Sequence, residues 1–118
     1  DLVTYDKEKK IIQKAISHIR ILKSSENLPQ KVGADSKKWI AGYLDNTLFV
    51  ERFNFDINGM YPDGGTSVTL FGNNLFSELE CLSPEKNLHI GETICYNLHW
   101  SLIKVNDEKE VNLILQSI

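Results

Sequence analysis

Residues 39–57 read WIAGYLDNTLFVERFNFDI, and this stretch carries the clearest strand pattern in the chain. Apolar and aromatic residues alternate on both sides of Asp45-Asn46, and both of these residue types tolerate the positive φ of a tight turn. The stretch therefore predicts a β-hairpin with one strand on each side of that turn. A short helix begun by Ser36 is the alternative, but it would contain Gly42, which costs about 1 kcal/mol relative to alanine.

The N-terminal part of the chain has a different pattern, in which apolar residues recur every three or four positions. This spacing places them on one face of an amphipathic helix, with lysines over most of the remaining surface. We expect the helix over about 5–25, ending before Pro29, because the residue before a proline is disfavoured in a helix. Its apolar face would consist of Ile12, Ala15, Ile16, Ile19 and Leu22.

Three later segments alternate as the hairpin does and predict strands over about 66–72, 75–82 and 93–102. The C-terminal segment 107–118 fits both a helix begun by an Asn-Asp pair and a strand that returns to the sheet. Of these two alternatives we favour the strand. In the longest alternation, the apolar side that we expect to face the core consists of Ile94, Tyr96, Leu98, Trp100 and Leu102.

Together these elements predict the α+β class, with one N-terminal helix packed on a curved antiparallel sheet of five or six strands. A chain of 118 residues with 42% apolar and 25% charged residues has the size and composition of a single globular domain, here residues 1–118. The order of a helix followed by a curved sheet resembles the cystatin-like and NTF2-like scaffolds in element order alone. No sequence motif of either family accompanies this order, so the resemblance implies a fold and no function.

The first residue and the two cysteines bear on the compartment of the protein. The chain begins at Asp1, and Cys81 and Cys95 lie 14 residues apart without a CxxC spacing. In an oxidising compartment they would form a disulfide worth about 3 kcal/mol in the chain-entropy model. In a reducing compartment they would be two small buried thiols. The even number of cysteines and the missing methionine favour an exported protein, periplasmic or secreted.

Charge is distributed unevenly along the chain. Residues 1–38 hold nine basic and five acidic residues, a net of +4, whereas residues 39–118 hold four basic and eleven acidic residues, a net of −7. An acidic sheet surface would steer a protein partner with a basic surface onto it, and aromatic residues outside the inward pattern would anchor that partner. The expected partner-binding residues are Glu51, Asp56, Tyr61, Asp63, Phe76, Glu78 and Glu80.

Nucleic acid and membranes are not expected as partners. Binding of nucleic acid needs a dense basic stripe, usually interleaved with aromatic residues, and the acidic C-terminal part of the chain would repel phosphate. No apolar run approaches the roughly 18 residues that a membrane-spanning helix needs. The oligomeric state is left open.

Motifs that carry chemistry are absent. The sequence has no Gly-x-Ser-x-Gly, no phosphate-cradling glycine loop and no cysteine and histidine pairs at zinc-finger spacing, so we expect no metal and no cofactor. His99 lies on the polar side of its predicted strand, where Glu51 or Glu80 across the sheet could form an acid–base pair with it. A hydrogen-bonded surface histidine is the commoner outcome and is favoured.

The sequence favours a small non-enzymatic binding protein of the inhibitor or immunity type, which occludes a basic partner protein such as a bacterial toxin. Small size, the lack of catalytic motifs and the acidic C-terminal part support this hypothesis. The alternatives are a small ligand-pocket protein or enzyme on a curved sheet, and a domain of a larger envelope assembly. A deep apolar pocket would favour the ligand-pocket alternative.

Overall fold

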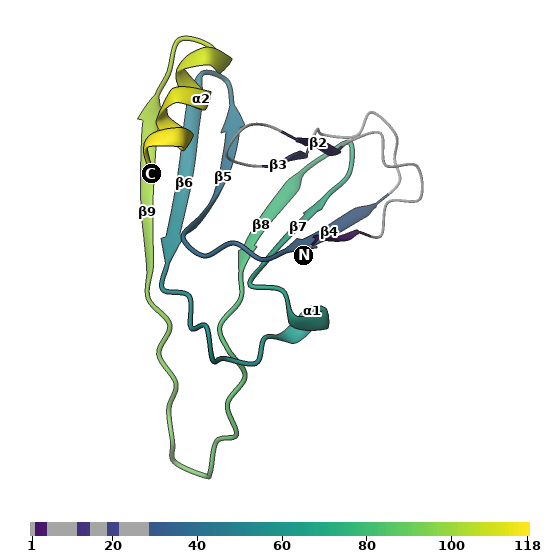
Figure 1. Cartoon of the computed structure of the whole chain (residues 1–118), viewed down its shortest axis with the longest axis vertical. Coiled ribbons are helices and arrows are strands. Elements are labelled where there is room, and N and C mark those ends of the chain that lie inside the picture. Colours follow the sequence, from purple (N-terminus) through teal and green to yellow (C-terminus); the bar gives the residue numbers. More distant parts are fainter. Residues whose placement is uncertain (1, 5–11, 15–18, 22–28) are drawn as a thin grey trace.

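The computed structural model describes residues 2–4, 12–14, 19–21 and 29–118, with side chains at residue 29 and residues 31–118. Figure 1 shows the order of the elements along the chain. They are β1 (Leu2–Thr4), β2 (Ile12–Lys14), β3 (Ile19–Ile21), β4 (Gln30–Ala34), β5 (Trp39–Leu44), β6 (Thr47–Phe53), α1 (Pro62–Gly65), β7 (Val68–Gly72), β8 (Ser77–Cys81), β9 (Leu98–Lys104) and α2 (Glu108–Ser117).

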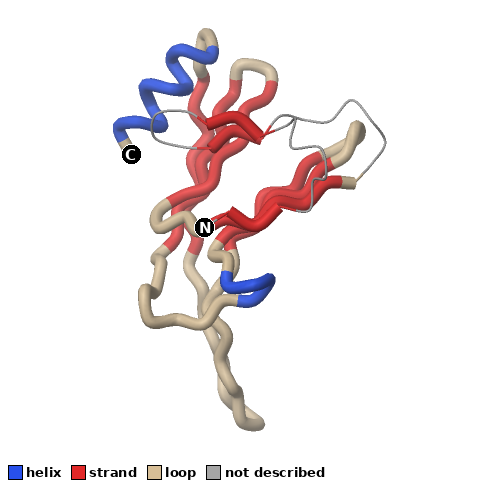
Figure 2. The backbone as a smooth tube through the Cα atoms, turned by 45° about the vertical axis from the view of Figure 1, so that its right-hand side comes forward, coloured by secondary structure: helices blue, strands red, loops and turns tan. Residues whose placement is uncertain are grey.

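Two antiparallel sheets and a C-terminal helix form the main part of the described fold, which confirms the α+β class. One sheet has the strand order β5-β6-β9, and the other has the order β4-β7-β8 with β1 beside β4. Within the described residues, β2 and β3 pair only with each other. β8 lies next to β5 without pairing with it, so the predicted sheet of five or six strands is divided into two smaller sheets that meet at an angle (Figures 1 and 2).

The helix predicted over residues 5–25 is wrong wherever this stretch is described. Ile12–Lys14 and Ile19–Ile21 are strands that pair in an antiparallel register. Both strands begin with isoleucine, whose β-branched side chain is stiff at χ1 and favours strands over helices. The rest of the predicted helix lies outside the described residues.

The predicted hairpin is confirmed. β5 and β6 pair along their full length around Asp45 and Asn46, whose φ values are 48° and 57°. Two successive residues with positive φ form the turn whose twist matches that of the flanking strands. The second strand ends at Phe53, four residues earlier than the alternation predicted.

The strands predicted around residues 66–82 are also confirmed, as β7 and β8. The Asn73 side chain organises their turn, because its Oδ1 accepts hydrogen bonds from the backbone N–H groups of Leu75 and Phe76. The 93–102 strand is confirmed only in its second half, because β9 begins at Leu98. Residues 82–97 form a long excursion without regular secondary structure, which descends below the sheets in Figure 1.

The C-terminal segment is a helix, so our preference for a strand there was wrong. Asp107 caps α2, since its Oδ1 accepts hydrogen bonds from the backbone N–H groups of Lys109 and Glu110 at 2.9 and 3.0 Å. This cap satisfies donors that have no partner within the helix. Val111 and Leu115, four residues apart, are both buried against the sheet. Capping and burial together decide between the two alternatives.

The β5-β6-β9 sheet has a buried cluster on each of its faces. The helix-side core lies between this sheet and α2, which packs on one face of the sheet (Figure 2). It consists of Leu48, Val50, Val105, Val111 and Leu115. The intersheet core lies between the two sheets and consists of Ile40, Phe53 and Val68 with the half-buried Leu70, Leu79, Cys81 and Tyr96.

A glycine allows the two sheets to approach closely. A Cβ atom on Gly42 of β5 would come within 3.1 Å of Leu79 Cδ1 on β8, so a larger residue would require the Leu79 side chain to shift. The hairpin strand β5 therefore contacts both the helix-side core, through Ala41, and the second sheet, through Gly42.

The β9 strand turns its more apolar side to solvent, which reverses our expectation for this strand. Trp100 and Leu102 are 71% and 75% exposed. Ser101 and Ile103 lie on the opposite side, which α2 covers. Alternation identifies the two sides of a strand, but the position of α2 decides which side is buried. None of the helices in the described residues is long and apolar enough to span a membrane.

Candidate functional site

Three of the seven predicted partner-binding residues share one surface with a further aromatic residue. Glu78 lies opposite Phe71 in the β7-β8 register, and Glu80 lies on the same side two residues further along β8. Phe76 precedes β8, and its ring centroid is 6.0 Å from that of Phe71. We call the surface formed by Phe71, Phe76, Glu78 and Glu80 the outer face.

The outer face combines exposed aromatic surface with free carboxylates. Phe76 is 47% exposed and Glu78 is exposed, whereas Glu80 is half-buried. Neither carboxylate forms a hydrogen bond or an ion pair in the part of the chain that the structure describes. The side chains of Leu70, Leu79 and Cys81 point to the opposite side of the sheet, into the intersheet core. The outer face is therefore carried by β7 and β8 of the sheet ordered β1-β4-β7-β8.

Asp63 borders this surface, but its charge is already paired. The Lys31 Nζ atom lies 2.8 Å from Asp63 Oδ2, and Lys31 is opposite Phe71 in the β4-β7 register. Both side chains are well exposed, so the ion pair contributes little to stability. It nevertheless neutralises the negative charge that the sequence led us to expect at this position.

Asp56 and Tyr61 lie away from the outer face, in the connection between β6 and α1. The Tyr61 ring stacks on Phe55 with centroids 5.2 Å apart and planes within 5°. Its hydroxyl oxygen accepts a hydrogen bond from the backbone N–H of Asp56 at 2.9 Å. Tyr61 is half-buried and holds this connection together, contrary to the expectation of a free aromatic anchor.

Glu51 does not reach the partner-binding surface at all. It lies on β6 with only 5% of its surface exposed, and its Oε1 accepts a hydrogen bond from Trp100 Nε1 at 2.8 Å. The Trp100 ring packs edge-on against Phe49 at 5.7 Å and covers the carboxylate from the solvent side. Glu51 is thus a buried carboxylate with a structural role, and its hydrogen-bond donor is the indole of the exposed Trp100.

A thiol and a phenol share the buried environment of Glu51. Burial, together with the charge of the nearby Glu51 carboxylate and a hydrogen bond to it, raises the pKa of Cys81 to about 12. Burial also raises the pKa of Tyr96 to about 12, with smaller contributions from Cys81, Tyr61 and Glu51. The Tyr96 hydroxyl is buried without a hydrogen-bond partner. Both groups are therefore protonated at neutral pH, and the Cys81 thiol is a poor nucleophile there.

The structure supports neither the acid–base pair, which was the less favoured alternative for His99, nor the disulfide alternative for the two cysteines. His99 faces the helix side of its sheet in a row with Trp39 and Arg52, whereas Glu51 faces the other side. Glu80 belongs to the second sheet. Cys81 and Cys95 are free thiols, because β8 pairs with β7 and Cys95 lies in the irregular segment before β9. The cysteines therefore give no support to export.

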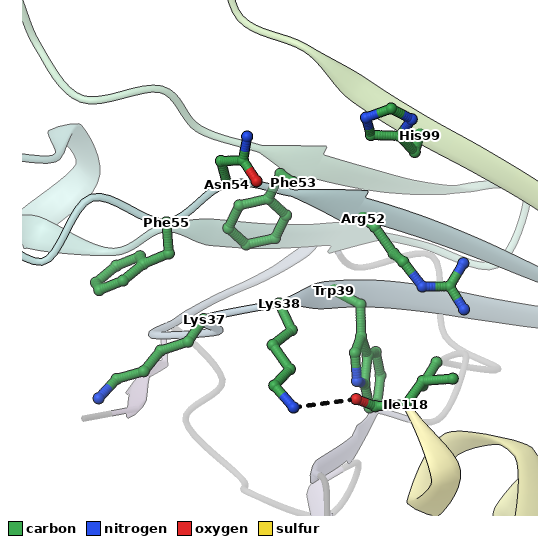
Figure 3. Close-up of a pocket in the computed structure, with 9 residues that line it drawn as sticks. All are labelled: Lys37, Lys38, Trp39, Arg52, Phe53, Asn54, Phe55, His99 and Ile118. Carbon is green, nitrogen blue, oxygen red and sulfur yellow. Dashed lines mark hydrogen bonds between the residues drawn. The ribbon is translucent and has the colours of Figure 1, made fainter.

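A basic cleft lies on the helix side of the β5-β6-β9 sheet, where α2 ends (Figure 3). Its volume is about 680 Å³. The segment before β5, the end of β6, β9 and the residue after α2 converge there, although they are far apart in the sequence. The lining residues are Lys37, Lys38, Trp39, Arg52, Phe53, Asn54, Phe55, His99 and Ile118.

Sequence reasoning missed this cleft because no local pattern marks it. Trp39, Arg52 and His99 become neighbours only through the register of β5, β6 and β9. The one available signal was the pair Lys37-Lys38 directly before an aromatic residue. In the sequence these two lysines counted only towards the net positive charge of residues 1–38. Two of the lining residues, Arg52 and His99, come from residues 39–118, the part of the chain that carries a net negative charge.

Comparison with known proteins assigns no relative to this chain. No protein-family model matches it, and neither the curated proteins nor the solved structures contain a significant match. Any functional proposal therefore depends on the geometry of the outer face and of the basic cleft.

Proposed function

We propose that this chain is a small non-enzymatic binding protein of the inhibitor or immunity type, which occludes a basic partner protein such as a bacterial toxin. One observation carries the proposal. Beside the ring pair Phe71 and Phe76, Glu78 and Glu80 present carboxylates that form no ion pair with any of the described residues. This combination suits a partner surface that offers lysine or arginine around an apolar pocket.

The two kinds of residue would act at different stages of binding. Unpaired carboxylates attract a basic partner over a distance of about 10 Å at 0.1 M salt and so accelerate association. Exposed aromatic rings are frequent hot spots, and they slow dissociation once they are buried in the complex. The net charge of −7 over residues 39–118 adds to the attraction. The separation of His99 from Glu51 and Glu80 weakens the enzyme alternative.

Affinity capture with matched variants tests this proposal. The chain is immobilised as wild type, as Glu78→Lys/Glu80→Lys, as Phe76→Ala and as the control Glu85→Lys, and each is exposed to a lysate of its source. Glu85 is exposed in the excursion between β8 and β9 and forms no side-chain bond in the described residues, so Glu85→Lys changes charge away from the outer face.

We expect the wild type and the Glu85→Lys control to retain the same basic protein, and both outer-face variants to lose it. Surface plasmon resonance on the purified partner at two salt concentrations should then show slower association for Glu78→Lys/Glu80→Lys and faster dissociation for Phe76→Ala. A partner that binds all four proteins equally would place the docking surface elsewhere. A captured protein with an acidic surface would contradict the proposal.

A further inference from the structure

The basic cleft concentrates positively charged side chains in one place. Lys37, Lys38 and Arg52 line it together with His99, and among the described residues no carboxylate side chain does. None of these four residues forms an ion pair in the described part of the chain. Like charges in a concave site repel one another, and an anion that enters the site removes this repulsion. The whole chain carries a net charge of −3, so this concentration is local.

Two of these cations are held in place by hydrogen bonds. Lys38 Nζ donates to the main-chain oxygen of Ile118 at 3.2 Å, beside the end of α2 (Figure 3). Arg52 Nη1 donates to Ser101 Oγ at 3.2 Å, which leaves further guanidinium N–H groups free to donate. A ligand would therefore meet donors whose orientation is already restricted, which lowers the entropic cost of binding.

The cleft also has an apolar wall and the dimensions of a small-molecule site. Trp39 and Ile118 line it beside the cations, whereas the Phe53 side chain, which borders the cleft, belongs to the intersheet core. Its volume of about 680 Å³ lies within the range of roughly 300–1,000 Å³ found for small-molecule pockets. Basic groups next to aromatic rings match a ligand that joins several negative charges to a flat, weakly polar part.

We propose that the basic cleft binds a small phosphate-bearing ligand of the nucleotide class. Its phosphates would accept hydrogen bonds from Lys37, Arg52 and His99, and its ring would lie against the aromatic wall. Phosphate is favoured over a single carboxylate because it carries more charge and more acceptor oxygens for donors that come from several side chains. This inference does not depend on the proposed function, since the cleft lies on the other sheet from the outer face.

Isothermal titration calorimetry on the full chain tests the proposal with four probes, which are ATP, tripolyphosphate, adenosine and hexaglutamate. We expect saturable binding of ATP with a Kd below about 1 mM, weaker binding of tripolyphosphate and none of adenosine. Affinity should fall as salt rises, because the interaction is largely ionic. Failure of ATP to bind would overturn the proposal. Equal affinities for ATP and tripolyphosphate would overturn it too, because the aromatic wall would then contribute nothing.

Matched variants separate the cleft from general charge effects. Lys37→Gln/Arg52→Gln should weaken ATP binding by at least about tenfold, because it removes charge-assisted hydrogen bonds. The control Lys109→Gln removes one positive charge at the opposite end of α2, as each substitution of the double variant does in the cleft. It should leave the Kd for ATP within about twofold of the wild-type value. If circular dichroism shows that the double variant is misfolded, Lys37→Gln alone replaces it in the titration, since the Lys37 side chain is exposed.

Two outcomes with these variants and probes would contradict the proposal. If the Lys109→Gln control and the cleft variants lost equal affinity for ATP, ATP would be attracted by the overall charge and would not bind a defined site. Tighter binding of hexaglutamate than of ATP would assign the cleft to an acidic protein segment and overturn the nucleotide class.

Discussion

The two cores on opposite faces of the β5-β6-β9 sheet bury different kinds of side chain. The helix-side core is apolar throughout its buried residues, from Leu48 and Val50 on the sheet to Val111 and Leu115 on α2. The intersheet core lies against the buried carboxylate of Glu51 and includes the Cys81 thiol and the Tyr96 ring. The stability of the helix-side core depends on close packing. The stability of the intersheet core also depends on whether each buried polar group finds a hydrogen-bond partner.

The difference follows from what covers each face. α2 returns directly from β9 and lays one continuous apolar stripe over the helix-side face. The second sheet covers only part of the other face, which leaves Trp100 and Leu102 at its exposed part. Trp100 lies at this boundary, with its ring in solvent and its N–H on Glu51. A partly covered face can therefore keep a carboxylate that a fully covered apolar core would exclude.

A charge in the helix-side core should give the largest effect. Val50 is fully buried, so Val50→Asp would place an unpaired carboxylate between the sheet and α2. We expect the free energy of unfolding to fall by several kcal/mol, which is a large part of a total of roughly 5–15 kcal/mol. Urea denaturation followed by circular dichroism measures it. The matched variant Leu102→Asp on the exposed side of β9 should lose less than about 1 kcal/mol, and equal losses would contradict the assignment of the two sides.

The two thiols should differ strongly in reactivity. Raising the pKa of Cys81 from 9.0 to about 12 lowers its thiolate fraction at pH 8 about a thousandfold, and burial hinders reagents further. Cys95 is exposed. Iodoacetamide at pH 8, followed by mass spectrometry, should modify Cys95 in the native protein and Cys81 only after unfolding. Glu51→Gln should speed modification of Cys81, because it removes a charge that raises this pKa. Equal native rates for both cysteines would contradict the intersheet core.

The hydrogen bond between Trp100 and Glu51 should contribute a smaller, separable amount. Trp100→Phe keeps an aromatic ring against Phe49 and removes the donor, and we expect a loss of about 1–2 kcal/mol because a charged acceptor loses its partner. In a Glu51→Gln background the same substitution should cost less. A double-mutant cycle of urea midpoints measures this coupling, and an energy of zero would mean that the bond is not formed in solution.

The smallest effect is expected from the Tyr96 hydroxyl. It is buried without a partner, so Tyr96→Phe should leave stability at pH 7 unchanged or raise it by up to about 1 kcal/mol. The pKa of Tyr96 is raised from 10.0 to about 12 in the folded state. The folded protein therefore holds the proton more tightly than the unfolded chain, and stability falls as pH rises from 10 towards 12. Tyr96→Phe should reduce this decline, and an unchanged pH profile would contradict the raised pKa.

Local chemistry in the sequence determined the turns and several of the strands. Asp45-Asn46 specified the β5-β6 hairpin because both residues accept positive φ, and Asn73 marked the β7-β8 turn. The cap at Asp107 was also visible, as one of two alternatives for the C-terminal segment. At the candidate site, Glu78 and Glu80 are two residues apart within a predicted strand, and the structure places them on one side of β8. These features depend on neighbouring residues and need no knowledge of the rest of the fold.

Tertiary structure decided what each surface faces. Alternation along β9 separates its two sides, but only the return of α2 determines that Ser101 and Ile103 are covered while Trp100 is exposed. The burial of Glu51 and the assembly of the basic cleft from Lys37, Arg52 and His99 likewise require strand pairings between residues far apart in the sequence. Burial and charge proximity are properties of the packed chain, because they depend on which elements meet and not on the residues of any one element.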